Sequence, residues 1–268
     1  MKYVPRYAFW SGGADSTYMI LRLLDEGLRV DKIFFSDTGM EFPEMYEYIK
    51  KVESFIKRKY NITIHRFFPA EDKDYATFSR GVGVIRGKEQ VRGIPRQLEP
   101  CWLQRNTKIR PFEKWLKDNN IKDHLIYIGY TADELRRAKL KAMKNNDAKI
   151  VDNNHLYPLI LWDIDSNKVK VELQKMGMLN PLYKHFNRTG CFMCPKVGDD
   201  TYFALWKHYP KEWEWMKKEE KKLKKLNAFN YRFNKDKSLK EMEKKFKKMD
   251  KNGVVRETTD QDFCFCVI

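Results

Sequence analysis

Short apolar runs alternate with amphipathic stretches through the first two-thirds of the chain. The apolar runs predict strands over Tyr7 to Trp10, Arg29 to Phe35, Thr63 to Phe67, Leu125 to Ile128 and Ile150 to Val151. The amphipathic stretches predict helices over Ser16 to Glu26, Pro43 to Tyr60, Phe112 to Asn119, Ala132 to Lys144 and Asn167 to Met176. Strands that alternate with helices predict an α/β fold, an open parallel sheet with helices on both faces.

After Lys196 the pattern becomes helical and strongly charged, which predicts a C-terminal helical extension to about Asp250 and then an irregular tail. We therefore expect a nucleotide-binding domain over residues 1–198 and a basic helical extension with a cysteine-containing tail over residues 199–268. The formal net charge is +16, and residues 207–251 carry 17 Lys/Arg against 8 Asp/Glu. Aromatic residues are interleaved with these lysines, namely Trp206, Trp213, Trp215, Phe229, Tyr231 and Phe233. Such a surface can bind a phosphate backbone and stack bases, or it can be a solvated helical hairpin whose aromatics pack inside.

The segment from Pro69 to Pro100 has no clear period and is rich in glycine and arginine. A connection of this length is too long to be a simple turn, so we expect a mobile lid or a substrate-binding segment, with a surface insertion as the alternative.

A glycine-rich loop separates the first strand from the first helix. It reads Ser11-Gly12-Gly13-Ala14-Asp15-Ser16-Thr17, a Ser-Gly-Gly-x-Asp-Ser pattern. Adjacent glycines let the backbone approach phosphate oxygens, hydroxyls add donors, and the helix directs its first amides at the anion. The loop lacks the lysine of the P-loop and the third glycine of the dinucleotide fingerprint. We therefore predict pyrophosphate binding by Ser11, Gly12, Gly13, Asp15, Ser16 and Thr17.

The second predicted strand ends at Phe35 and is followed by Ser36-Asp37-Thr38-Gly39. The carboxyl ends of neighbouring parallel strands meet at the crevice where open α/β sheets bind ligands. We therefore expect Asp37, Thr38 and Gly39 to contribute to nucleotide binding, with Asp15 and Asp37 as magnesium-binding or loop-organising groups.

Five cysteines in a chain of 268 residues indicate metal or redox chemistry rather than a disulfide framework. The two-residue spacing of Cys191 and Cys194 lets both thiolates reach one metal or cluster, although a redox dithiol or inert packing would give the same spacing. Cys101 is the natural third ligand, and Cys264 or Cys266 could be the fourth. Zinc and a four-iron cluster are equally consistent with this set.

These motifs occur in an order that resembles the PP-loop ATP pyrophosphatase superfamily, in particular its phosphoadenosine phosphosulfate (PAPS) reductase-like branch. Ser-Gly-Gly-x-Asp-Ser is followed by Asp37-Thr-Gly-x-Glu-Phe-Pro-Glu44, by Lys108-x-x-Pro111, by Gly129-x-x-x-x-Glu134 with Arg136 and Arg137, and by Arg188-x-Gly-Cys191-x-x-Cys194. The similarity extends from about Tyr7 to Lys196, and it implies the adenine nucleotide alpha hydrolase-like fold.

The resemblance implies that ATP binds at the Ser11 to Thr17 loop, with Gly129 beside it. The loop amides, Lys108, Arg136 or Arg137 and Mg²⁺ would then neutralise the developing negative charge while pyrophosphate leaves, and Asp15 would bind magnesium or organise the loop. The favoured function is adenylation of a nucleic acid, tRNA or DNA, for sulfur insertion, with an iron–sulfur [4Fe–4S] or Zn²⁺ centre and a sulfur donor such as a cysteine desulfurase. Two alternatives are a sulfonucleotide reductase acting through a tail cysteine and a non-catalytic nucleic-acid-binding protein.

No apolar run reaches the roughly 18 residues of a membrane span, and no signal peptide is recognisable, so we expect a cytoplasmic protein without a membrane partner.

Overall fold

The computed structural model describes residues 3–67, 82–85, 87–97, 99–138 and 154–254. These residues form two compact units. The first contains residues up to 36 together with 43–67 and 111–181, and the second contains 37–42, 68–110 and the residues from 182 onward. The predicted division of the chain into domains of residues 1–198 and 199–268 stays a prediction.

The first unit is built on a five-stranded, wholly parallel sheet in the order β3-β2-β1-β6-β7. Its strands are β1 (Arg6–Trp10), β2 (Lys32–Ser36), β3 (Ile64–Phe67), β6 (Leu125–Tyr127) and β7 (His155–Leu156). The predicted strand at Ile150 to Val151 lies outside the described residues, and the fifth strand is the later β7.

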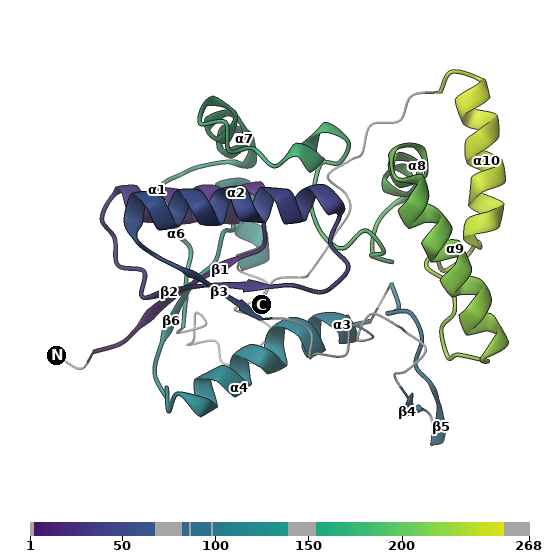
Figure 1. The fold of residues 1–268 in the computed structure, drawn as a ribbon, viewed down its shortest axis with the longest axis horizontal. Helices are drawn as coiled ribbons and strands as arrows, with labels where there is room; N and C mark the ends of the chain where they lie inside the picture. The colour runs from purple at the N-terminus through teal and green to yellow at the C-terminus, as the bar shows by residue number, and fades with distance from the viewer. Residues whose placement is uncertain (1–2, 68–81, 86, 98, 139–153, 255–268) are drawn as a thin grey trace. The chain divides into compact units, whose positions relative to one another are not determined.

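Helices cover both faces of this sheet, as predicted (Figure 1). On one face lie α1 (Ala14–Asp25) and α2 (Pro43–Tyr60), and on the other lies α4 (Arg110–Asp118). The remaining helical elements of the unit are η3 (Ala132–Glu134), α6 (Pro158–Leu161) and α7 (Ser166–Lys175), and the predicted helix from Ala132 to Lys144 extends beyond the described residues.

Side-chain alternation along the strands explains the two faces. Phe34 of β2 lies 4.8 Å from the ring of Trp115 in α4, whereas Phe35 lies 5.4 Å from Trp10. Trp10 in turn lies 6.3 Å from Tyr48 of α2. Because successive side chains point to opposite faces, the apolar run Ile33-Phe34-Phe35 fills both halves of the core, and all three residues are buried.

The helix that ends in α4 begins earlier than predicted. The chain is helical from α3 (Trp102–Gln104) through η2 (Arg105–Ile109), a π-helical turn, into α4. Pro111 therefore lies inside the helix rather than before it. Proline lacks the amide that would bond the carbonyl of residue 107, and a widened turn at that point accommodates the loss.

The second unit contains a β-hairpin and a helical extension. The hairpin pairs β4 (Val82–Ile85) with β5 (Lys88–Val91), so this part of the predicted lid is regular structure, and residues 68–81 lie outside the described residues. The extension comprises α8 (Asp199–His208), α9 (Pro210–Lys225) and α10 (Leu239–Lys251), and the short η4 (Pro181–Lys184) precedes it in the chain. It confirms the predicted helical C-terminal part. Among the described residues, no helix is both long and apolar enough to cross a membrane.

Candidate functional site

The glycine-rich loop joins β1 to α1 in the first unit, the strand–loop–helix context in which such loops bind phosphate. Gly12 has φ +75°, and a Cβ atom built there would lie 2.5 Å from Met45 Sδ. Gly13 is the N-cap of α1 and supplies no side chain to the first-turn amides. The positive end of the α1 dipole is therefore directed at the loop, and no side chain of Gly13 occupies the first amides of the helix.

Hydroxyl groups fix the loop from within. The Ser11 amide donates to Ser16 Oγ at 3.1 Å, and the two serine hydroxyl oxygens lie 3.0 Å apart. Ser11 is exposed, whereas Ser16 is buried. These contacts leave Ser11 as the loop hydroxyl that solvent reaches.

The Thr17 hydroxyl has a structural role. It donates to the Gly13 carbonyl at 2.8 Å and accepts from Trp10 Nε1 at 2.8 Å and from Tyr48 at 3.1 Å. With 1% exposure it supports the loop from below rather than presenting a donor to solvent.

Two residues outside the loop complete its support. Asn180 Nδ2 donates to the Gly12 carbonyl at 2.9 Å. A Cβ atom at Gly129, shortly after β6, would lie 3.0 Å from the Ser16 amide nitrogen, so a glycine is needed for the sheet to approach α1 this closely. The resemblance pointed to Gly129, but no sequence signal marked Asn180.

Asp37, Thr38 and Gly39 follow β2 and belong to the second unit. Asp37 Oδ1 accepts from the Gly39 amide at 2.8 Å, in an Asx-type turn that Gly39 allows with φ +72°. Both Asp37 and Thr38 are buried. The carboxylate of Asp37 thus organises the turn, one of the two roles expected for it.

A polar cluster in the second unit links this turn to the cysteines. Thr38 Oγ1 donates to Glu41 Oε1 at 2.8 Å and lies 3.3 Å from Cys191 Sγ. Since the one hydroxyl proton of Thr38 is used by Glu41, the Cys191 thiol is the donor in the second contact. The Phe192 amide donates to the Met40 carbonyl at 3.0 Å, which fixes the cysteine turn against the turn after β2.

Charges in this cluster oppose one another. Burial raises the pKa of the Glu41 carboxyl, while the Lys108 ammonium and the Thr38 hydroxyl lower it. Burial, and to a smaller extent the charge of Glu41, raises the pKa of the Cys191 thiol. The positive charge of Lys108 lowers the same pKa. Lys108 lies in the π-helical turn, an element frequent at functional sites. Sequence reasoning assigned no role to Glu41, although it stands within the Asp-Thr-Gly-x-Glu pattern.

Cys101, Cys191 and Cys194 belong to the same unit, and none of them forms a disulfide within the described part of the chain. The Cys194 amide donates to the Cys191 carbonyl at 3.1 Å in a tight turn, and Cys101, the N-cap of α3, interacts electrostatically with Cys191. In the part of the chain that the structure describes, no three His, Cys, Asp or Glu side chains are arranged to hold a metal. Cys264 and Cys266 lie outside that part.

The two candidate arginines differ in their surroundings. Arg137 pairs with Glu134, and its guanidinium lies 4.7 Å over the ring of Tyr130, whereas Arg136 is exposed. Arg137 is therefore held in place, and Arg136 faces solvent.

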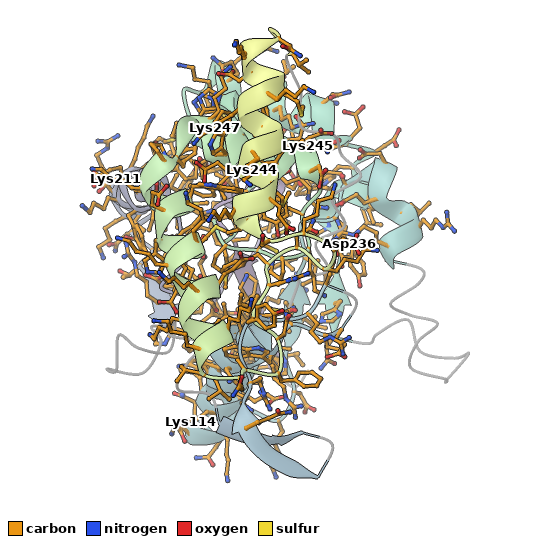
Figure 2. All side chains as sticks on the ribbon, turned by 90° about the vertical axis from the view of Figure 1, so that its right-hand side faces the viewer. Lys114, Lys211, Asp236, Lys244, Lys245 and Lys247 are labelled. Carbon is orange, nitrogen blue, oxygen red and sulfur yellow. The ribbon has the colours of Figure 1, made fainter. Side chains whose placement is uncertain are left out.

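The aromatics of the basic extension serve mainly in packing. Trp213 and Phe233 are each 1% exposed, so stacking of bases on these two rings is excluded. Trp206 lies 6.0 Å from Phe246, and Trp215 lies 5.5 Å from Phe192. The lysines project from α9 and α10, as Lys211, Lys244, Lys245 and Lys247 show in Figure 2. The cationic surface is present, and Trp206, Trp215, Phe229 and Tyr231, all half-buried, are the stacking candidates that remain of the six predicted aromatics.

Residues 6–197 match the phosphoadenosine phosphosulfate reductase domain, well over half of the chain. The chain belongs to this family. Members of the PAPS reductase domain family bind nucleotides, so a nucleotide-binding fold is established here. The expected resemblance is confirmed.

Two uncharacterized proteins of Methanocaldococcus jannaschii are relatives of this PAPS reductase domain protein. The first is 29% identical over 218 residues, 78% of this chain, and the second is 24% identical over 212 residues, 75% of this chain. The aligned part makes up only 40% and 44% of their lengths. This chain thus spans less than half of each of these relatives.

Two solved structures are also similar. A PAPS reductase from Candida auris in a phosphate complex has a TM-score of 0.45 and 15% identity, covering 71% of this chain and 82% of that one. The U34-tRNA thiolase of Methanococcus maripaludis with its [4Fe-4S] cluster has a TM-score of 0.40 and 14% identity, covering 66% of this chain and 59% of that one. The family membership rests on the sequence match to residues 6–197.

Proposed function

We propose that this PAPS reductase domain protein is an ATP pyrophosphatase that adenylates an acceptor oxygen, on a nucleic acid such as tRNA or DNA, in preparation for sulfur insertion. The observation that carries the proposal is the Ser-Gly-Gly-x-Asp-Ser loop in its strand–loop–helix setting, where Gly12 has a positive φ and a Cβ atom at that position would meet Met45. Such a loop binds a pyrophosphate group through backbone amides and needs no P-loop lysine.

In the proposed reaction the acceptor oxygen attacks the α-phosphorus of ATP, and the bond to the bridging oxygen of pyrophosphate breaks. Catalysis would then consist of positioning and charge neutralisation. We assign the phosphate cradle to the Ser11 to Thr17 backbone, with Thr17 bracing it through its bonds to Gly13, Trp10 and Tyr48. Lys108, Arg136 and Arg137 are proposed as neutralising cations from the family resemblance, and Mg²⁺, near Asp15 or Asp37, would supply further positive charge.

The proposal is tested by a matched pair of substitutions in one helix. Asp15→Asn changes the first turn of α1, and Asp25→Asn makes the same change at its last residue, which pairs with Lys59 on the surface. We expect Asp15→Asn to lower ATP-dependent pyrophosphate release by about 100-fold, the effect of losing one organising group in such a site. Asp25→Asn should leave the rate unchanged. Equal rates for both variants would contradict the assignment.

We further propose that Cys101, Cys191 and Cys194 hold a metal centre, either [4Fe–4S] or zinc, with Cys264 as a candidate fourth ligand. The tight turn joining Cys191 to Cys194 and the electrostatic proximity of Cys101 support a thiolate donor set. As the side chains stand, Cys191 bonds Thr38 and the set is not closed around one point. When bound, an iron–sulfur centre with an open iron would supply a site for sulfide.

Metal analysis of anaerobically purified protein tests this centre. Each of Cys101→Ser, Cys191→Ser and Cys194→Ser should lower bound iron or zinc substantially, because each removes one thiolate from the shared site. Met193→Leu, a change of the buried residue between two of the ligands, should keep full metal content. Full content in all three cysteine variants would rule out a shared centre.

The family match itself favours a second function, a sulfonucleotide reductase that releases sulfite from PAPS or adenylyl sulfate. Incubation with either sulfonucleotide and a thiol reductant separates the two functions. Sulfite formation without ATP would favour the reductase. Pyrophosphate formation from ATP in the absence of sulfonucleotide would favour adenylation. For the adenylating function, we propose a cysteine desulfurase as the sulfur donor and the cytoplasm as the location.

A further inference from the structure

A cavity of about 290 Å³ lies in the second unit, between the segment after β5 and the loop that joins α9 to α10. Its walls include Arg96 and Gln97 from the first segment and Phe229, Asn230, Arg232 and Lys235 from the second. The volume is near the lower limit of small-ligand pockets, about 300 to 1,000 Å³, and therefore suits one nucleotide unit rather than a larger ligand.

Backbone hydrogen bonds hold the two walls together. The Phe229 amide donates to the Val91 carbonyl at 2.8 Å, and the Ile94 amide donates to the Asn230 carbonyl at 2.8 Å. A Cβ atom at Gly93 would lie 1.9 Å from the Asn230 oxygen, so only glycine permits this approach. The cavity is consequently a built feature, formed by two segments more than 130 residues apart in the sequence.

The opposite side of the loop is held as well. Glu220 of α9 accepts from the Phe233 amide at 3.1 Å and from the Leu239 amide at 2.9 Å. These bonds hold both ends of the segment from Phe233 to Leu239, which carries Lys235 and directly follows Arg232. The cavity wall is thereby preorganised for a ligand.

Polar groups in the cavity walls are arranged for a ligand. Arg232 Nε and Gln97 Oε1 are buried and make no hydrogen bond to any described residue. Arg232 Nε is a hydrogen-bond donor and Gln97 Oε1 is an acceptor, and a donor together with an acceptor can recognise the hydrogen-bonding edge of a nucleobase. Buried polar atoms are normally satisfied, so these two leave hydrogen-bonding capacity unused in residues that line the cavity.

Aromatic and cationic groups in the same walls fit the rest of a nucleotide. The Arg96 guanidinium lies 5.4 Å over the Phe229 ring and also pairs with Glu99, which holds it at the rim. Lys235 is exposed, and Arg232 lies in the field of Glu220 and Glu241. Stacking on an aromatic ring beside cations that bind phosphate is the usual chemistry of single-strand recognition.

We infer that this cavity binds one unstacked nucleotide of a single-stranded polynucleotide, with the base between Phe229, Gln97 and Arg232 and the phosphates beside Arg96 and Lys235. A polynucleotide is favoured over a free nucleotide because lysines flank the cavity loop on both sides in the sequence, Lys221, Lys224 and Lys225 before it and Lys237 and Lys240 after it. The inference deepens the proposed function, on which it rests for the identity of the acceptor as a nucleic acid.

The test is binding of a fluorescein-labelled 12-nucleotide single strand, RNA and DNA in parallel, by the full chain at several salt concentrations. Arg232→Gln and Lys235→Gln should weaken binding and make the log–log salt slope shallower by about 0.7 for each phosphate that the variant no longer neutralises. Phe229→Leu should weaken binding roughly tenfold, since stacking is removed, with the slope unchanged. Arg58→Gln and Phe55→Leu, matched changes on helix α2 of the other unit, should leave binding unchanged.

Affinities that are the same in all variants would overturn the inference. Lys235→Gln alters only an exposed side chain, so its result stands even where Arg232→Gln disturbs the loop. Pyrophosphate release from ATP is measured on the same preparations. A wild type that releases none but binds strands through this cavity refutes the proposed function alone, whereas normal release with unchanged strand binding in every variant refutes the cavity alone.

Discussion

At the scale of single residues, the glycine-rich loop is shaped by hydrogen bonds to its side chains and carbonyls and by close packing at Gly12. Thr17 is bonded on three sides, and Asn180 holds the Gly12 carbonyl from another part of the chain. Gly12 combines a left-handed backbone conformation with close approach to Met45. The free energy of unfolding and the affinity for nucleotide should therefore both depend on this one position.

Gly12→Ala tests that dependence. It should lower the free energy of unfolding by about 1–3 kcal/mol for backbone strain and by a further 1–3 kcal/mol because Met45 must shift. Gly27→Ala is the matched control, since Gly27 also has positive φ, +66°, but a Cβ atom there would meet nothing within 4 Å. Urea unfolding should show the larger loss for Gly12→Ala, and calorimetry should show weakened ATP binding for that variant alone. Equal losses of stability would contradict the packing account.

At the scale of elements, the helical extension is held by ion pairs as well as by its apolar core. Glu243 of α10 pairs with Lys217 of α9 and with Lys247 one turn along its own helix. Trp213 and Phe246 pack beneath, 5.9 Å apart. A lysine-rich pair of helices is thus joined by a carboxylate whose loss would leave like charges facing one another.

The stability of α9 and α10 should fall in acid through Glu243. Partial burial raises the pKa of this carboxyl, but hydrogen bonds from Lys217 and Lys247 lower it to about 2, below its ordinary 4.5. The folded state therefore favours the ionised form, so the stabilisation is present above about pH 4.5 and is lost as the pH falls toward 2.

Thermal unfolding of wild type and Glu243→Gln between pH 7 and pH 3 measures this contribution. The difference in midpoint should be largest at pH 7 and should shrink as the pH falls below the unfolded pKa. A difference that does not vary with pH would show that the pairs contribute nothing through charge.

Helices and strands could be predicted from the sequence where the local spacing of apolar residues determines their type and their approximate bounds. The first three strands and the helices α1, α2 and α7 follow the predicted pattern, because their apolar spacing matches their burial. The helix of residues 112–119 was predicted, but its start was placed too late because proline ordinarily stands at the beginning of a helix, and here a π-helical turn before Pro111 accommodates it. The hairpin of β4 and β5 was missed because its strands are only four residues each and contain glycine and charged residues.

At the scale of the whole molecule, the chain passes back and forth between the two compact units, and each unit contains three separate segments. Sequence order alone therefore does not reveal the units. The glycine loop and the cysteine pair could be predicted as motifs because their spacing carries the chemistry. Asn180 and the Arg96 to Lys235 cavity could not, because they depend on contacts between distant segments. Glu41 was overlooked although it stands in the Asp-Thr-Gly-x-Glu motif and bonds Thr38 three residues away. The aromatics of the extension show the same limit, since Trp213 is core and Phe229 lines a cavity in a similar sequence context.

The position at which ATP is cleaved tests the central claim most directly. The full chain is incubated with Mg²⁺, single-stranded RNA or DNA and ATP labelled at either the α- or the γ-phosphorus, and the products are separated. We expect the γ label in pyrophosphate and the α label in AMP or in an adenylated acceptor, with both signals lost in Asp15→Asn and kept in Asp25→Asn. Release of the γ label as inorganic phosphate with formation of ADP, or no ATP cleavage together with sulfite release from PAPS, would contradict an adenylating pyrophosphatase.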